Sequence, residues 1–170
     1  VYSHPFSHQI VLNKGSNDGV TVGQPLLDDL GVLGQIVSVG PASSRALLIV
    51  DNTHAISGRI ERTGLSVVAE GIGQADTLRL IHLPHSTDVI EGDRLVTSGL
   101  DGVFPEGYPI GRISKVQRDA RQPFLQVNSE PYAKLDRIRY VLLVWPHHGT
   151  SVADPQIIAP ESEESGKEQR

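Results

Sequence analysis

Hydrophobic side chains in this chain alternate with polar ones in short runs, and glycine or proline separates one run from the next. Ile10 and Leu12 alternate with polar neighbours ahead of the turn-forming residues 15–19, and similar runs recur along the chain. Alternation with a period of two is typical of a half-buried β-strand, and clusters of Gly, Asn and Asp are typical of turns. The pattern therefore predicts an all-β protein.

The alternating runs also give the expected positions of the strands. Residues 45–50 are apolar after Arg45, which indicates a strand buried on both faces. Gly34 predicts a β-bulge or the close approach of another backbone. Only residues 42–45 and 131–135 favour a helical turn. We expect strands over residues 8–14, 24–28, 32–39, 45–50, 54–61, 65–71, 77–83 and 137–145, and a strand on each side of a loop within 93–113.

Two segments of the chain resemble each other. Residues 32–39 and 109–116 share the frame apolar-Gly-polar-Ile-x-x-Val, and each follows a lead that contains Asp and Gly. This agrees with a duplicated β-unit and equally with similar turn chemistry in two unrelated hairpins. The expected architecture is two small six-stranded barrel-like subdomains packed together, one centred roughly on 65–120 and the other built from the flanking segments.

Composition divides the chain into a nearly neutral body and an acidic end. The net charge is −5, and residues 150–170 hold five acidic against two basic side chains. A general nucleic-acid-binding protein needs a basic surface, so this function is not expected. Residues 161–170 have no large apolar side chain, which predicts a disordered acidic tail over 150–170 after a β-domain over 1–149.

The chain has no Cys and no Met, even at position 1. Thiolate metal sites and cysteine nucleophiles are therefore excluded. The missing Met predicts a piece of a longer protein. No apolar run approaches the roughly 20 residues that span a bilayer, so this piece is not expected to contact a membrane directly.

Histidines and a serine give two candidate chemistries, and neither pattern is strong. Pro84 between His82 and His85 disfavours a helix that would place both rings on one face, so we predict no metal site and no cofactor. The alternative function is a two-barrel, chymotrypsin-like serine hydrolase, whose Asp, His and Ser would be Asp51, His54 and Ser98. The residues before Ser98 lack the glycines of such nucleophile loops, and a turn-capping role for its hydroxyl is favoured.

Other glycines and basic residues have simpler explanations. The glycines between 99 and 111 lie between strands and not ahead of a helix, so they are turn residues and no phosphate site. The basic residues recur every third position, which scatters them over both faces of a strand. We expect them to protect a sheet edge: Arg112, Lys115, Arg118 and Arg121.

The loop within 93–113 is the leading candidate for an interaction surface. Rigid aromatic residues beside prolines are typical anchors of protein interfaces. We expect Phe104 to close the end of a small barrel, while Tyr108 and Tyr132 remain candidates for contact. The candidate surface comprises Thr97, Ser98, Gly99, Phe104, Pro105, Gly107, Tyr108 and Pro109.

The order and spacing of several motifs resemble the rod-shape-determining MreC family. Residues 97–100, Thr-Ser-Gly-Leu, precede residues 104–109, Phe-Pro-Glu-Gly-Tyr-Pro, and the resemblance runs from about residue 11 to 145. Upstream, it rests on Asn13 to Val20, Gly23-Gln24-Pro25, Gly34-Gln35, and Ser44-Arg45 leading to residues 47–51.

This resemblance implies a fold, a location and partners. It implies two six-stranded barrel-like subdomains in the periplasm, and a full-length protein anchored in the inner membrane by an N-terminal helix that is followed by a coiled coil. It implies a non-enzymatic scaffold of the cell-elongation complex that maintains cell shape by binding and regulating peptidoglycan-synthesis enzymes. The implied partners are the elongation penicillin-binding transpeptidase, MreD, MreB and further copies of the same protein in dimers or filaments.

Overall fold

The computed structural model describes residues 8–145, and their regular structure is eleven strands and one 3-10 helix. This confirms the predicted all-β class. The elements are β1 (Gln9–Leu12), η1 (Ser16–Asp18), β2 (Pro25–Leu27), β3 (Val32–Val39), β4 (Ser44–Leu48), β5 (Ala55–Ile60), β6 (Ser66–Gly71), β7 (Leu78–Leu80), β8 (Arg94–Thr97), β9 (Pro109–Gln117), β10 (Gln126–Pro131) and β11 (Leu142–Leu143).

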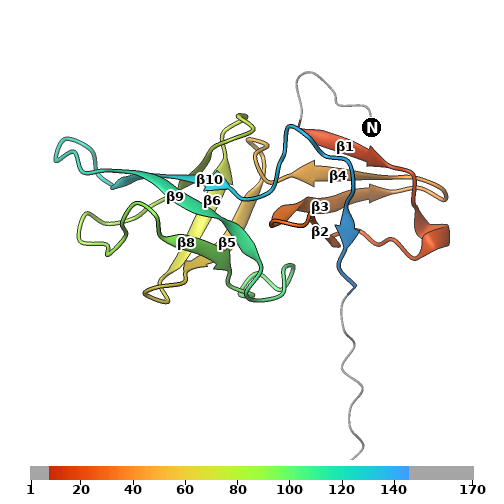
Figure 1. Ribbon diagram of the computed structural model, residues 1–170, viewed down its shortest axis with the longest axis horizontal. Coiled ribbons are helices and arrows are strands. Elements are labelled where there is room, and N and C mark those ends of the chain that lie inside the picture. The colour runs from red at the N-terminus through yellow and green to blue at the C-terminus, as the bar shows by residue number, and fades with distance from the viewer. Residues whose placement is uncertain (1–7, 146–170) are drawn as a thin grey trace, which may run out of the picture.

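Six of these strands close into an antiparallel barrel in the order β10-β7-β6-β5-β8-β9. It forms the left part of the molecule in Figure 1. Ile56, Leu80, Leu95 and Ile110 are among the fully or almost fully buried side chains of these strands. Closure leaves no free strand edge, because the first and last strands also pair.

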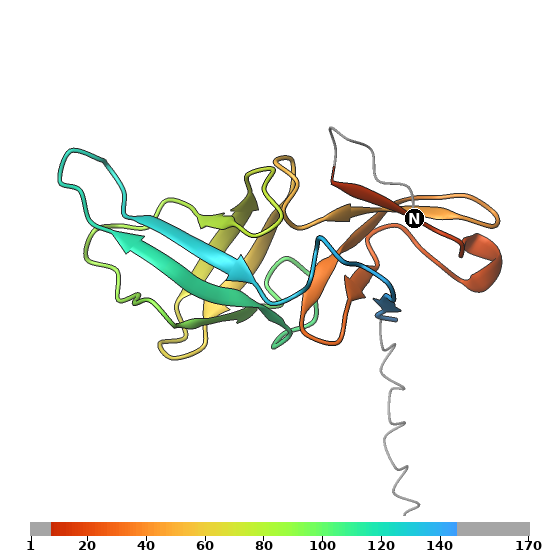
Figure 2. The ribbon, with the colours of Figure 1, turned by 45° about the horizontal axis from the view of Figure 1, so that its top comes forward.

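The other strands form a five-stranded sheet in the order β1-β4-β3-β2-β11. This sheet lobe lies beside the barrel in Figures 1 and 2, and the buried apolar residues of both parts form one continuous core. One six-stranded barrel is thus present as expected, whereas the second unit has five strands among residues 8–145. Its edge strand β11 pairs with the short β2 through Leu142–Leu27 and Leu143–Leu26, and the N–H of Val144 donates to the carbonyl of Pro25 at 3.0 Å.

Gly34 combines the two features predicted for it. The register between β2 and β3 shifts beside it, since Leu26 pairs with Gly34 and Leu27 with Val32. An added Cβ at Gly34 would lie 2.0 Å from the carbonyl oxygen of Leu47 on β4. Only glycine allows the neighbouring backbone to come this close.

The sequence pattern misplaced several segments. The predicted strand over 137–145 is wrong in length, because only Leu142 and Leu143 form a strand. The helical turn over 42–45 is also wrong, since Ser44 and Arg45 begin β4. The helical turn over 131–135 is wrong as well, since Pro131 ends β10 and the residues after it form bends and a turn. Strand β10 was not predicted because Ser129, an inward-facing residue, is polar. Its hydroxyl is buried and donates to the carbonyl of Arg112 at 3.1 Å.

The four basic residues on β9 and in the loop after it do not protect an edge, contrary to the prediction. Strand β9 pairs with β8 on one side and β10 on the other. Arg112 and Lys115 are exposed on the outside of the barrel. Arg118 donates to the carbonyls of His85 and Thr87, and Arg121 pairs with Asp119 at 3.1 Å. These basic side chains therefore hold loops or face solvent.

Candidate protein-binding site

Thr97 closes the loop between β8 and β9. Its backbone N–H donates to the carbonyl of Tyr108 at 2.8 Å, and its carbonyl accepts from the N–H of Gly107 at 2.9 Å. Its hydroxyl donates to the carbonyl of Pro105 at 2.5 Å and accepts from the N–H of Tyr108 at 2.8 Å. The side chain is fully buried. Thr97 therefore fixes both ends of the loop.

Left-handed glycines and one aspartate shape the loop itself. Gly99, Gly102 and Gly107 have φ angles of 74°, 70° and 92°, which agrees with the turn role expected for the glycines of this loop. Such angles are readily adopted only by glycine. The carboxylate of Asp101 accepts hydrogen bonds from the N–H groups of Val103 and Phe104 at 3.0 and 3.2 Å. The loop therefore has a defined backbone shape.

Phe104 attaches this loop to the core. Its side chain is almost fully buried in the core, in line with the structural role expected for it, and its ring meets the edge of His54 at a centroid distance of 6.3 Å. Tyr108 is half-buried against the core. Pro109 begins β9. Buried anchors of this kind hold the remaining loop residues in place at the surface.

The loop forms one wall of a groove between the barrel and the sheet lobe. The groove has a volume of about 1300 Å³, and its other walls are residues 21–25 with Leu27 and residues 142–145. Figures 1 and 2 both show the loop after β8 beside the sheet lobe. Val22, Leu100 and Leu142 line the groove with 67%, 75% and 62% of their surface exposed. Exposed apolar side chains gathered in this way indicate an interaction surface.

Polar groups are few in this groove. Glu106 is the only charged residue among those that line it, and its carboxylate pairs with Arg59. Gln24 is buried, and its Oε1 accepts from the N–H of Thr21 at 3.2 Å. Its Nε2 has no hydrogen-bond partner among residues 8–145. The groove thus offers mainly apolar contact.

The sequence located one wall of this groove and missed the others. Of the eight predicted residues, Ser98, Gly99, Phe104, Pro105 and Tyr108 line it, Thr97 and Gly107 shape the loop behind it, and Pro109 starts the next strand. Val22, Gln24, Leu142 and Trp145 were not predicted. The one available signal was Val22, an apolar residue within the turn 21–24. The sequence alone does not show which distant residues lie beside it.

The chain also matches a known family over this whole region. Residues 1–145 match the family described as "Rod shape-determining protein MreC, barrel core". The chain belongs to the MreC family. It is 46% identical over 156 residues to the cell shape-determining protein MreC of Haemophilus influenzae, which covers 92% of this chain and 44% of that protein. The chain thus spans less than half of that MreC relative.

Solved MreC structures share the fold. The crystal structure of MreC from Pseudomonas aeruginosa has a TM-score of 0.81 and 46% identity to this chain, and the match covers 85% of this chain and 94% of that one. A more distant similarity, with a TM-score of 0.61 and 20% identity, is to a complex between penicillin-binding protein PBP2 and MreC from Helicobacter pylori. That match covers 80% of this chain and 85% of the other.

The three residues of the alternative hydrolase site make separate contacts in this MreC fold. His54 Nε2 hydrogen-bonds to Gln35 Oε1 at 3.0 Å, and the Ser98 hydroxyl accepts from the N–H of Leu100 at 3.2 Å. The Asp51 carboxylate accepts from the N–H and the hydroxyl of Thr53 at 2.9 and 2.6 Å. A catalytic triad needs these side chains bonded to one another. The geometry therefore supports the turn-capping role of Ser98.

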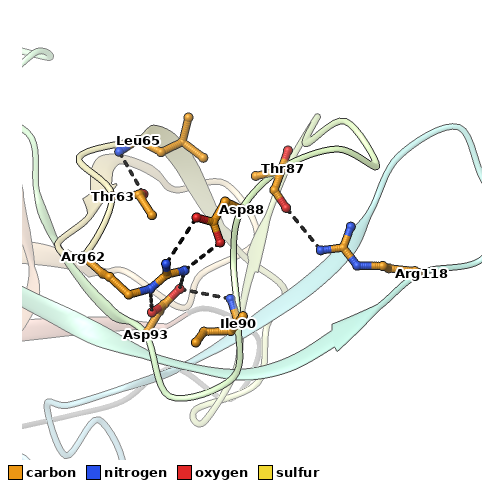
Figure 3. Close-up of polar contacts among 8 residues, drawn as sticks. All are labelled: Arg62, Thr63, Leu65, Thr87, Asp88, Ile90, Asp93 and Arg118. Atoms are coloured by element: carbon orange, nitrogen blue, oxygen red, sulfur yellow. Dashed lines mark hydrogen bonds and ion pairs between the residues drawn. The ribbon is translucent and has the colours of Figure 1, made fainter.

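A separate polar cluster lies on the barrel and fixes its longest connection. Figure 3 shows Arg62 between Asp88 and Asp93. Arg62 Nε and Nη2 donate to the Asp93 carboxylate at 2.8 and 3.0 Å, and the same carboxylate accepts from the N–H of Ile90 at 3.0 Å. The hydrogen bond from Arg62 lowers the pKa of Asp93. The cluster holds residues 88–93 to the β5–β6 hairpin and takes no part in the groove.

Residues 8–145 contain neither a cluster of metal ligands nor a membrane-spanning helix. Within 8–145, no three His, Asp or Glu side chains gather as a metal site would require. His85 Nε2 bonds to the carbonyl of Gln122 at 2.8 Å, and His82 packs against Phe124. The pair His147–His148 lies outside the described residues. No helix in the described part has the length and apolar character to cross a bilayer.

Proposed function

We propose that this chain is a non-enzymatic, periplasmic scaffold of the cell-elongation complex, which maintains cell shape by binding and regulating peptidoglycan-synthesis enzymes. The observation that carries the proposal is the apolar groove between the barrel and the sheet lobe. Membership of a family whose relatives are named cell shape-determining proteins supports it. A catalytic role for the groove has less support than a binding role. The only charged residue of its lining, Glu106, is already paired with Arg59.

The proposed partner for the groove is the elongation penicillin-binding transpeptidase. The fold neighbour that is a complex of PBP2 with MreC supports this choice. By family resemblance, MreD and MreB are further proposed partners of the whole protein, as is self-association into dimers or filaments. The periplasmic location and the membrane anchor upstream of this chain belong to the same proposal.

The geometry of the groove suggests how binding would act. Val22 and Leu142 belong to the sheet lobe and Leu100 to the barrel loop, so one apolar partner segment would contact both parts at once. Burial of exposed apolar surface stabilises association by roughly 25 cal/mol per Å². A scaffold that binds one conformation of an enzyme better than another shifts the enzyme toward that conformation. Regulation thus requires differential affinity and no chemistry.

A titration of the chain against the purified ectodomain of the elongation transpeptidase tests the proposal, with transpeptidation and polymerisation followed in parallel. Leu100→Asp places a charge on the exposed loop wall, and we expect it to weaken binding at least tenfold. Leu30→Asp is the matched control, because Leu30 is also exposed but lies outside the groove. If both variants lose binding equally, or if neither loses it, the contact lies outside the groove.

The hydrolase alternative has its own test. A serine-reactive probe that labels the chain covalently, with labelling abolished by Ser98→Ala, would support an enzyme and overturn the scaffold. On the proposed function, the probe labels neither the parent chain nor Ser98→Ala, because the Ser98 hydroxyl caps the turn to Leu100 and has no catalytic base beside it among residues 8–145.

A further inference from the structure

A second pocket lies on the outside of the closed barrel. Its volume is about 460 Å³, and it is lined by residues 79–82 and 122–128. The loop between β9 and β10, which forms one side, is at the end of the molecule away from the sheet lobe in Figures 1 and 2. None of these residues lines the apolar groove. The pocket is therefore a separate site whose role does not depend on the proposed transpeptidase contact.

Regular strand pairing ends at this point, just beyond the ends of β7 and β10. Val127 pairs with Leu80, and the N–H of Leu125 donates to the carbonyl of Leu83 at 2.8 Å. Two residues on one side, Ile81 and His82, therefore face a single residue on the other. An extra residue on one side bends the chain and redirects a side chain, as it does in a β-bulge.

His82 has the most unusual backbone of the pocket. Its φ of 57° is the only positive φ of a non-glycine residue within 8–145. Its ring packs edge-on against Phe124, with the centroids 5.3 Å apart. A residue held in a sparsely populated conformation motivates a functional hypothesis for its surroundings.

Hydrogen bonds from elsewhere in the barrel fix the loop wall. Arg118 donates to the carbonyl of His85. It also donates to the carbonyl of Thr87 at 3.2 Å, the contact drawn in Figure 3. His85 Nε2 bonds to the carbonyl of Gln122 at 2.8 Å. The pocket wall is thus tied to the connection that follows β7. A preformed wall lowers the entropy lost when a ligand binds.

The lining combines a cation, amides and an aromatic ring. Arg79 is exposed, and it forms no ion pair among the described residues although Glu70 is its cross-strand neighbour. Phe124 keeps 43% of its surface exposed. No Asp or Glu lines the pocket. The carboxamides of the lining are those of Gln122, Gln126 and Asn128.

We propose that this pocket binds a saccharide that carries one carboxylate. The guanidinium of Arg79 matches a carboxylate, for which an Arg forms paired hydrogen bonds. Carboxamides both donate and accept, as the hydroxyl and acetamido groups of a sugar require. Phe124 supplies an apolar face for the sugar ring. One cation suits one carboxylate and not a polyphosphate, and the volume falls within the roughly 300–1,000 Å³ of small-molecule sites.

A two-dimensional amide NMR titration of the 170-residue chain tests this inference. The probes are N-acetylmuramic acid and N-acetylglucosamine, which differ by the lactyl carboxylate. We expect N-acetylmuramic acid to bind at least fivefold more tightly and to shift the amide signals of residues 79–82 and 122–128. Absence of shifts at tens of millimolar, or shifts confined to other residues, would overturn the proposal.

Variants and a third probe test separately the recognition of the carboxylate and that of the sugar ring. Arg79→Gln is expected to remove the preference for the acidic sugar, and Phe124→Ala to weaken both sugars at least fivefold. Arg112→Gln, an exposed change on β9 outside the pocket, is expected to change neither. N-acetylglutamate tests a carboxylate without a sugar ring. If it binds as tightly as N-acetylmuramic acid, or if Arg79→Gln keeps the preference, the assignment of an acidic saccharide is wrong.

Discussion

Individual residues fix the loop that forms the groove wall. Thr97 is a polar residue inside the core, and it is stabilised there because its hydroxyl and its backbone groups all have hydrogen-bond partners within the loop. Phe104 holds the loop to the core from the other side. With these residues in place, Leu100 is exposed on a surface whose shape is set in advance. A preorganised loop loses less entropy on binding than a flexible one.

Substitution of Gly107 should disturb this loop. The backbone there has a φ of 92°, and Gly107→Val introduces a β-branched residue that disfavours that conformation. We expect a loss of stability of about 1–2 kcal/mol, measured by chemical unfolding, together with weaker transpeptidase binding. Gly107→Asn should cost less, because asparagine tolerates positive φ. A stable, fully binding Gly107→Val chain would count against the importance of the turn.

Asp93 should matter more for stability than its neighbour Asp88. The Asp93 side chain is only 4% exposed, and Asp93→Ala leaves the N–H of Ile90 and the Nε of Arg62 without their acceptor. We expect a loss of about 1–3 kcal/mol in the free energy of unfolding. Asp88→Ala is the control, because that carboxylate contacts the same Arg62 at the surface. Equal effects of the two substitutions would show that burial of Asp93 is unimportant.

At the scale of elements, the two similar segments of the sequence occupy equivalent strands. Residues 32–39 form β3, between β2 and β4, and residues 109–117 form β9, between β8 and β10. The series β1-β4-β3-β2-β11 then corresponds to β7-β10-β9-β8-β5. Only β6, which closes the barrel between β5 and β7, has no counterpart among the described residues. The shared strand order agrees with a duplicated unit.

The equivalent glycines of the two segments predict matching defects. In Gly34→Ala, the added Cβ would lie 2.0 Å from the carbonyl oxygen of Leu47. In Gly111→Ala, it would lie 2.4 Å from the carbonyl oxygen of Glu130. We expect each change to cost about 1–3 kcal/mol, because a neighbouring backbone must move.

Amide hydrogen exchange would show where each change acts. Protection should fall between β3 and β4 for Gly34→Ala and between β9 and β10 for Gly111→Ala. Gly40→Ala is the control, since its nearest contact would be an ordinary 3.5 Å. Unchanged protection in both strand pairs would contradict the inferred close approach.

At the scale of the whole molecule, His54 joins the barrel to the sheet lobe. It precedes β5, its Nε2 bonds to Gln35 on β3, and its ring meets Phe104 of the groove loop. Burial lowers its pKa, although Asp51 and Asp101 act in the opposite direction, and its Nδ1 has no partner among the described residues. The neutral ring is thus part of the contact between the two parts.

This arrangement predicts a pH dependence of stability. Because the folded state lowers the pKa of His54, the unfolded chain binds the proton more readily, and stability falls as the pH drops below about 6.5 toward the folded pKa. His54→Gln should reduce this dependence in unfolding experiments between pH 7.5 and 5.5. His85→Gln, a change in an exposed loop, should not. An unchanged pH dependence in His54→Gln would remove His54 as its source.

The sequence by itself determined the all-β class, most strand positions and the loop that carries the family motif. These features depend on local properties: alternation with a period of two, turn residues, and glycine where φ is positive. Strand β10 and the short β11 were misjudged, because the burial of Ser129 and the exposure of Leu142 depend on neighbours distant in sequence.

Only the tertiary structure decided which residues share a surface. Val22, Leu100 and Trp145 come from three separate segments, and no local pattern reveals that they line one groove. The same is true of Arg79 and Phe124 in the second pocket. Binding surfaces of this kind arise from strand order and barrel closure. These are set by pairing between distant segments, which the local hydrophobic period cannot specify.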